Sequence, residues 1–412
     1  MEAKAKIWCD EDEHKRFEYY VDFNDWLDSE DAVSLRETYK VDGISVPSKA
    51  FYAGDKEAYD QAFKEYRERR RNEVLNERYL CEQFTDDHWF QRNVQRFDQL
   101  ADSLKDGDVV PFIGAGISKA GGFPTWKEHL RGQGRTAGIE PAHTEELLAN
   151  GEYETVIGEI EANRGRDVFI QEIRDVFSRT GQIADITLLI TELFTDTIIT
   201  TNYDRLIEQA FDTGAKDTFQ IIDGMNPLDD PDPNRVSIIK LHGDIKNPDR
   251  CILSKKQYDQ AYGNGGIDLT RPIPKLLEYY YKNSSLLFLG CSLNNDRSIQ
   301  VFRAIKQKLG DIVIPQHFTI EQAPETEREL VVRNEYLLRL GITGIWFEKN
   351  QFEYIEGMLR LARNELRYRG VFPGGAKKGA EAVINNPMQE RGFMGKVWSR
   401  LFGQSGQGSM QE

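Results

Sequence analysis

Four short apolar runs of this chain each end in residues that could contact a ligand or move a proton. Their ends are Gly-Ala-Gly at 114–116, Asn-Tyr-Asp at 202–204, His-Gly-Asp at 242–244 and Gly-Cys-Ser at 290–292. Glycine lets a backbone turn sharply and approach a ligand closely. Asparagine can orient a bound water, and histidine exchanges protons near neutral pH. Any one of these ends could be an ordinary turn, but four together indicate a binding or catalytic cleft.

The runs before these ends predict the strands that position them. Residues 108–113, 196–201, 237–241 and 285–289 are rich in apolar and β-branched side chains, as in strands buried on both faces. Patterns of helical period lie between them, so the strands should be parallel. Ligands of open parallel sheets bind at the carboxyl ends of the strands, where the four motifs lie. We therefore predict an α/β fold with a doubly wound, mostly parallel Rossmann-like sheet.

The first motif suits a diphosphate. A helix that follows Gly114 and Gly116 would direct its free N–H groups and the positive end of its dipole at one point. A strict Gly-x-Gly-x-x-Gly pattern would need glycine at position 119, where the chain has Lys119. Because glycine-rich turns after strands are common, this segment alone leaves nucleotide binding and an ordinary turn equally open.

Together the four motifs resemble those of the sirtuin-like family. Residues 114–118 resemble its NAD-binding loop, 201–204 its T-x-N-x-D segment, 241–243 the segment with its catalytic histidine, and 290–292 its second dinucleotide loop. The closer resemblance is to the bacterial sirtuin-like NAD hydrolases of anti-phage defence. These carry Gly-x-Pro-x-Trp after the first loop, as this chain does at 122–126.

The resemblance implies an NAD glycohydrolase, which cleaves NAD to nicotinamide and ADP-ribose, with NAD as substrate and no metal. His242 would be the general base, Asn202 would orient the water and the ribose, and Asp204 would accept from the nicotinamide carboxamide. The diphosphate is expected to contact Gly114, Ala115, Gly116 and Ser118. The adenosine half is expected to contact Gly290 and Ser292. Such an enzyme would deplete NAD as a defence effector when a partner or assembly triggers it.

Each expected catalytic residue has a structural alternative. His242 could be a core histidine, Asn202 a turn residue, and Asp204 the N-cap of a helix. For the whole chain, the alternatives are a non-catalytic assembly module that binds NAD or ADP-ribose, and an ADP-ribosyltransferase. Deacylation is disfavoured because the chain lacks the Cys-x-x-Cys pairs that hold the structural zinc of deacylases. Its four cysteines are scattered, at Cys9, Cys81, Cys251 and Cys291.

The composition limits the partners. The chain has 412 residues with 53 Lys and Arg against 68 Asp and Glu, and its net charge of −15 disfavours strong direct binding to nucleic acid. No apolar run approaches the roughly 20 residues of a transmembrane helix. The N-terminus lacks an apolar signal segment, and scattered cysteines fit a cytoplasmic location. The aromatic residues of the N-terminal extension suggest packing on the main domain or on a neighbouring subunit of a homo-oligomer. The resemblance adds a HerA-type ATPase as a candidate partner.

Three regions are expected along the chain. Residues 1–100 should form an α-rich extension, with one helix over about 55–84 whose arginines are ion-paired on a solvated face. Residues 101–370 should form the sirtuin-like NAD-binding domain, with a helical insertion at about 125–195 that caps the cleft. Residues 371–412 have the composition of a flexible tail that contains one short amphipathic helix.

Beyond Gly290 the sequence alternates between patterns typical of helices and patterns typical of strands. Helices are expected over 299–309, 325–340 and 352–368, and strands over 312–320 and 342–347. This alternation fits the far edge of a doubly wound sheet.

Overall fold

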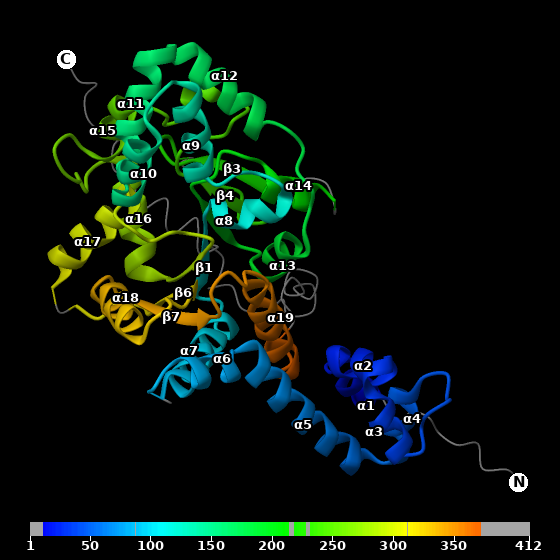
Figure 1. Cartoon of the computed structure of the whole chain (residues 1–412). Helices are drawn as coiled ribbons and strands as arrows, with labels where there is room; N and C mark the ends of the chain where they lie inside the picture. Colours follow the sequence, from blue (N-terminus) through cyan, green and yellow to red (C-terminus); the bar gives the residue numbers. More distant parts are fainter. Residues whose placement is uncertain (1–10, 87, 214–217, 228–230, 311, 372–412) are drawn as a thin grey trace, which may run out of the picture.

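The computed structural model describes residues 11–371, apart from 87, 214–217, 228–230 and 311 (Figure 1). The amphipathic helix expected within the tail lies outside these residues. Within them, no helix combines the length and the apolar composition that a bilayer crossing requires.

A parallel sheet of seven strands forms the centre of the described structure, in the order β3-β4-β2-β1-β5-β6-β7. The strands are β1 Val109–Ile113, β2 Thr197–Thr200, β3 Phe219–Asp223, β4 Val236–Lys240, β5 Ser285–Leu289, β6 His317–Gln322 and β7 Ile342–Phe347. Every residue of β1, β2, β4 and β5 is buried, which explains why these strands are nearly continuous apolar runs. The predicted doubly wound, Rossmann-like α/β fold is confirmed.

The strand order reverses at β1. The chain places β2 and then β4 on one side of β1, and later β5, β6 and β7 on the other. Hydrogen bonds extend past the strand ends here: Gly114 N donates to Leu289 O at 2.9 Å, and Thr201 N donates to Ile113 O at 3.4 Å. The ends of β1, β2 and β5 are therefore adjacent, and a crevice opens at such a reversal point.

Four helices of the insertion cover the carboxyl edge of the sheet, at the top of Figure 1. They are α9 Trp126–Thr136, α10 Pro141–Asn150, α11 Tyr153–Arg164 and α12 Arg166–Phe177. A capping box between Thr125 and Glu128 starts α9. The apolar stripe Phe169, Ile173 and Phe177 packs into a core of its own, separate from the core around the sheet. The insertion thus has enough apolar burial to hold its shape above the sheet.

The remaining helices around the sheet follow the alternation expected from the sequence. They are α7 His88–Lys105, α13 Asp185–Leu193, α14 Leu206–Asp212, α15 Lys255–Tyr262, α16 Pro272–Asn283, α17 Arg297–Leu309, α18 Glu327–Arg339 and α19 Glu353–Tyr368. Two details of the strand predictions were wrong. Strand β3 was not predicted, and β6 begins at His317 because Ile312 and Val313, expected in a strand, are exposed in the preceding loop.

The first helices pack together at the lower right of Figure 1, away from the sheet. They are α1 Glu11–Glu18, α2 Val21–Asp28, α3 Val33–Thr38 and α4 Pro47–Gly54, and they meet α5 Lys56–Val74. Phe23, Tyr59 and Phe63 belong to their aromatic core. The single helix predicted over 55–84 was wrong: Asn76 adopts a left-handed conformation, with φ of +63°, between α5 and α6 Glu77–Gln83.

Helix α7 protects the edge strand β7. Asn93 donates to Trp346 O at 2.9 Å and accepts from Trp346 N at 2.7 Å, and Arg96 donates to Gly344 O at 2.7 Å. Asn76 accepts from Glu348 N at 3.1 Å. These side chains satisfy backbone groups that would otherwise offer a template for another strand.

Candidate functional site

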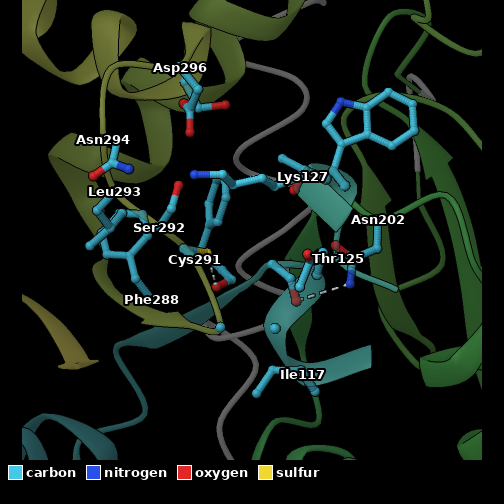
Figure 2. Close-up of a pocket in the computed structure, with 18 of the residues that line it drawn as sticks. Ile117, Thr125, Lys127, Asn202, Phe288, Cys291, Ser292, Leu293, Asn294 and Asp296 are labelled. Carbon is cyan, nitrogen blue, oxygen red and sulfur yellow. Dashed lines mark hydrogen bonds between the residues drawn. The ribbon is translucent and has the colours of Figure 1, made fainter. Parts of the chain in front are cut away.

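A cavity of about 990 Å³ opens at the carboxyl ends of the central strands (Figure 2). This is the upper range of ligand cavities. Eight of the nine predicted site residues line it: Gly114, Ala115, Gly116, Asn202, Asp204, His242, Gly290 and Ser292. Ser118 does not. The structure therefore brings together motifs that lie as much as 176 positions apart in the sequence (114 to 290).

The two glycine loops touch backbone to backbone. A Cβ on Gly114 would lie 2.5 Å from Gly290 O, and one on Gly116 would lie 2.8 Å from Gly290 Cα. Gly290 itself has φ of +66°. A side chain at any of these positions would separate the loops, so glycine is required for the closeness of the loops. The helix expected after the first loop is only the four-residue turn α8, Ala115–Ser118, whose dipole is correspondingly small.

Asn202 is held at the end of β2 by its side-chain nitrogen. Its Nδ2 donates to Gly114 O at 3.1 Å and to the hydroxyl of Ser118 at 3.0 Å. Among the described residues, none donates to its Oδ1, which leaves that atom for a ligand in the cavity. The asparagine is thus oriented by the first glycine loop while its oxygen remains available.

Asp204 lies one residue before Arg205, which is the N-cap of α14, so the expectation that Asp204 is the N-cap was wrong. Its Oδ1 accepts from the backbone N–H of Leu206 at 3.0 Å, and its Oδ2 accepts from Ser118 at 2.8 Å. The residue also lines the cavity. The Ser118 hydroxyl is buried between Asn202 and Asp204, so it supports these two side chains from behind.

His242 follows β4 and meets two tyrosines from α15. Its Nε2 lies 2.8 Å from the Tyr262 hydroxyl, and its ring meets that of Tyr258 edge-on at 5.3 Å between centroids. Burial lowers the pKa of His242 to about 4, so the imidazole is neutral at pH 7 and can accept a proton. Neither tyrosine was predicted as a site residue, although their spacing of four places both on one helix face.

The insertion contributes an aromatic wall beside the histidine. The ring of Trp126 lies 5.2 Å from that of Tyr203, and the ring of Phe177 lies 6.2 Å from both. Trp126 and Phe177 line the cavity. Large apolar rings near the histidine reduce the access of bulk water, a condition for controlled cleavage of a reactive bond.

The opposite end of the cavity is built around the second loop. Arg333 donates to both carboxylate oxygens of Glu321, at 2.7 and 3.0 Å, and to the carbonyls of Ser292 and Leu293 at 2.9 and 3.2 Å. Leu293 has φ of +47°, which is uncommon for a leucine. Arg333 thereby fixes a strained loop to the end of β6. Figure 2 shows Ser292, Leu293 and Asn294 along this side of the cavity.

Among the residues that the structure describes, the cavity has no activated thiol. Cys291 lines it, but burial raises the pKa of that thiol far above neutrality, and its Sγ donates to Phe112 O at 3.4 Å. A protonated thiol is a poor nucleophile. Within the described residues, no group of three or more His, Cys, Asp or Glu side chains could hold a metal ion.

Comparison with known proteins supports the resemblance that the motifs predicted. Residues 196–343, from before β2 into β7, match the model of the SIR2-like domain. The chain is 27% identical over 202 residues to the NAD(+) hydrolase ThsA of Acinetobacter baumannii (strain 532279), covering 48% of this chain and 39% of that protein. It is 25% identical over 285 residues to the protein of the same name from Bacillus cereus (strain MSX-D12), covering 66% and 57%.

A third relative is named for defence. The chain is 24% identical over 277 residues to Defense-associated sirtuin 2 of Bacillus subtilis, covering 64% of this chain and 26% of that protein. The chain spans less than two thirds of the length of each of these relatives. The matched segment includes Asn202, His242 and Gly290, but the first glycine loop lies before it.

Proposed function

Because the chain carries a SIR2-like domain and resembles NAD(+) hydrolases, we propose that it is an NAD glycohydrolase that acts in anti-phage defence. The reaction would be NAD⁺ plus water giving nicotinamide, ADP-ribose and one proton. The observation that carries the proposal is the meeting of Asn202 and His242 in one cavity with two glycine loops. A partner or assembly would trigger the activity in the infected cell.

The proposed orientation of NAD follows the strand order. The diphosphate would lie over Gly114, Ala115 and Gly116 and against Gly290, where only backbone separates the two loops. The adenosine half would extend toward Ser292 on the β5 side. The nicotinamide ribose would then lie at the ends of β2 and β4, beside Asn202 and His242.

The side chains fit the chemistry of glycosidic cleavage. As the bond between nicotinamide and ribose C1′ breaks, its electron pair leaves with nicotinamide and positive charge develops on the ribose. Asn202 Oδ1 would accept from the attacking water, and the neutral His242 would take the proton that this water or a ribose hydroxyl releases. Asp204 remains a candidate to accept from the nicotinamide carboxamide, although both of its oxygens already accept from protein groups.

Two other functions use parts of the same site. A non-catalytic module that binds NAD or ADP-ribose needs the glycine loops, but it has no use for a neutral base next to a positioned amide. An ADP-ribosyltransferase needs the same base and differs only in the group that captures the ribose cation. The presence of His242 and Asn202 in one cavity therefore favours an enzyme over the module.

The direct test is nicotinamide release from NAD by the purified chain. We expect release by the wild type and at least a roughly 100-fold loss in His242→Ala and in Asn202→Ala. His143→Ala is the matched control, because that histidine is exposed, pairs with Glu159 and lies outside the cavity. Release that persists in both site variants would contradict the assignment, and labelled protein without free ADP-ribose would indicate transfer.

The cellular location and the partners are also proposals that rest on the sequence. We propose a cytoplasmic homo-oligomer that pairs with a HerA-type ATPase, which light scattering and co-purification can test. If the isolated chain releases no nicotinamide, the assay is repeated with that ATPase added. No release in either case would leave the NAD-binding module as the better account.

A further inference from the structure

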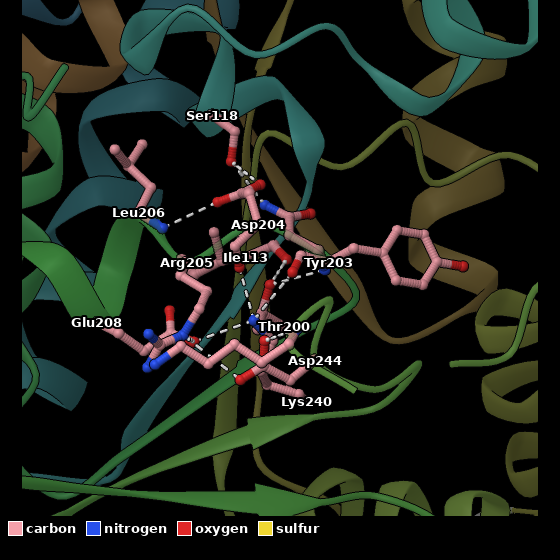
Figure 3. A network of polar contacts seen from close by, with 12 residues as sticks. Ile113, Ser118, Thr200, Tyr203, Asp204, Arg205, Leu206, Glu208, Lys240 and Asp244 are labelled. Atoms are coloured by element: carbon pink, nitrogen blue, oxygen red, sulfur yellow. Dashed lines mark hydrogen bonds and ion pairs between the residues drawn. The ribbon is translucent and has the colours of Figure 1, made fainter. Parts of the chain in front are cut away.

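A lysine is buried inside the sheet beside the proposed active site. Lys240 is the last residue of β4, and 1% of its side chain is exposed. Removing an ammonium group from water is costly unless the charge is paired and its hydrogen bonds are made. Its presence here therefore requires compensating contacts, which Figure 3 shows.

The ammonium group uses its three donors on the segment that follows β2. Lys240 Nζ donates to Asp204 O at 2.6 Å, to Tyr203 O at 3.3 Å and to Glu208 Oε1 at 3.0 Å. Lysine has three N–H donors and no acceptor, so this set fully satisfies it. Two of the three acceptors are backbone carbonyls, whose position depends on the path of the loop rather than on a side-chain rotamer.

The contacts join the two segments that carry the proposed catalytic groups. Lys240 precedes His242 by two residues, and the carbonyls that it holds belong to the two residues after Asn202. Backbone bonds add to the same junction, since Leu241 N donates to Thr200 O at 2.9 Å. The lysine is thus a buried side-chain link between the end of β4 and the loop after β2, beside the ion pair of Arg205 with Asp244 at 3.5 Å.

We propose that Lys240 is a positioning residue for NAD hydrolysis, whose ammonium group fixes the Asn202 amide relative to the His242 ring. This inference rests on the function proposed above. Lys240 does not line the cavity, so it acts through the two segments that it joins. NAD and the reacting water, bound in the cavity, would therefore not contact it.

Charge neutralisation of Glu208 is the structural alternative. The Glu208 carboxylate is buried, but it also has Arg205 Nε at 3.6 Å, and Arg205 Nε lies 3.5 Å from Asp244. Glu208 would therefore keep one cation if Lys240 were replaced. The carbonyls of Tyr203 and Asp204, in contrast, would lose the lysine donor. Replacing Lys240 therefore distinguishes the positioning of the loop from the neutralisation of Glu208.

The proposal predicts an uneven kinetic effect. The loops expected to hold the diphosphate and the adenosine half follow β1 and β5, and none of the three acceptors of the Lys240 ammonium group lies in them. Its loss should displace the nicotinamide end of the site and leave most ground-state binding intact. A displacement of about 1 Å of a reacting group can cost on the order of 100-fold in rate.

The experiment compares Lys240→Met, the double variant Lys240→Met/Glu208→Gln, and wild type. We expect kcat for nicotinamide release to fall about 30- to 100-fold in both variants, with KM for NAD within about threefold of wild type. The double variant lacks the unbalanced carboxylate, so it should regain part of the Tm lost by the single variant without regaining kcat. Arg67→Met, which breaks the ion pair with the buried Glu365 away from the cavity, should lower Tm and preserve kcat.

Two results would overturn the positioning role. One is a kcat near wild type in Lys240→Met; the other is recovery of kcat in the double variant, which would mean that the lysine only neutralises Glu208. Hydrogen exchange of peptides covering 201–206 gives a readout independent of activity and should be faster in the double variant. If the wild type leaves NAD intact even with the ATPase added, the proposed function fails. Unchanged exchange in these peptides would overturn the link whether or not NAD is cleaved.

Discussion

The Nε2 nitrogen of His242 lies 2.8 Å from the hydroxyl oxygen of Tyr262, the last residue of α15. This contact ties the ring at the end of β4 to a helix on the far side of the loop. Because α15 also supplies Tyr258, two tyrosine rings flank the imidazole, which is half-buried and lines the cavity. The protonation of His242 therefore depends on burial more than on any neighbouring charge.

The first prediction concerns pH. Burial lowers the pKa of His242 to about 4, so the neutral form that can accept a proton dominates above that pH. We expect kcat/KM for NAD to be flat from about pH 5.5 to 8 and to fall only as the pH approaches 4. An acidic limb near the usual imidazole pKa of about 6.5 would contradict this environment. Tryptophan fluorescence at each pH would verify that the protein remains folded.

The second prediction separates support from substrate contact at Ser118. Its hydroxyl bonds to Asn202 and Asp204 and does not line the cavity, so Ser118→Ala should lower kcat about tenfold and leave KM nearly unchanged. Ser292→Ala is the comparison, because Ser292 lines the cavity and should mainly raise KM. If Ser118 holds the diphosphate, as expected from the resemblance, Ser118→Ala should instead raise KM. Steady-state kinetics of both variants decide between these outcomes.

Much of the fold could be predicted because the central strands are recognisable from their apolar composition. Strands buried on both faces must be apolar throughout, and the runs ending at Gly114, Asn202, His242 and Gly290 each satisfied this rule. Parallel packing then requires that their ends meet at one edge. The sequence thus predicted eight of the residues that line the cavity, although the catalytic roles of those residues remain predictions.

The remaining features depend on contacts between distant segments. Strand β3 is only half-buried at most positions, so its apolar pattern is weak. The interruption after α5 arises at Asn76, whose side chain bonds to Glu348 N, a partner 272 positions away. The contacts of Lys240 were not predicted, because its three acceptors follow a different strand. Periodicity reports which face is buried, but it does not identify what a buried polar group contacts.

The third prediction tests the contact between the glycine loops. A Cβ on Gly114 would lie 2.5 Å from Gly290 O and 2.8 Å from Cys291 Sγ, so Gly114→Ala must push the loops apart. We expect a loss of about 1–3 kcal/mol in the free energy of unfolding and a clear loss of NAD affinity by calorimetry. Gly132→Ala is the control, since that glycine lies within α9 with nothing within 4 Å of an added Cβ. It should be neutral or stabilise by about 0.5–1 kcal/mol, with unchanged affinity.

The last prediction assigns a structural role to the helix that covers β7. Asn93 is fully buried and bonds to Leu75 O and to both backbone groups of Trp346, so Asn93→Ala leaves polar groups of the edge strand without a partner. We expect a loss of about 2–4 kcal/mol in the free energy of unfolding, measured by denaturant titration. Asn163→Ala is the control, because the Asn163 side chain makes one exposed bond to Ala137 O and should change stability by less than about 0.5 kcal/mol.

Activity separates this role from catalysis. Asn93 lies outside the cavity, so the folded fraction of Asn93→Ala should release nicotinamide at the wild-type rate. The exposed edge should also favour pairing between chains, and light scattering should detect association near the unfolding midpoint that the Asn163→Ala control lacks. A stable, non-associating Asn93→Ala protein would mean that Arg96 and Asn76, which bond to Gly344 O and Glu348 N, suffice to protect β7.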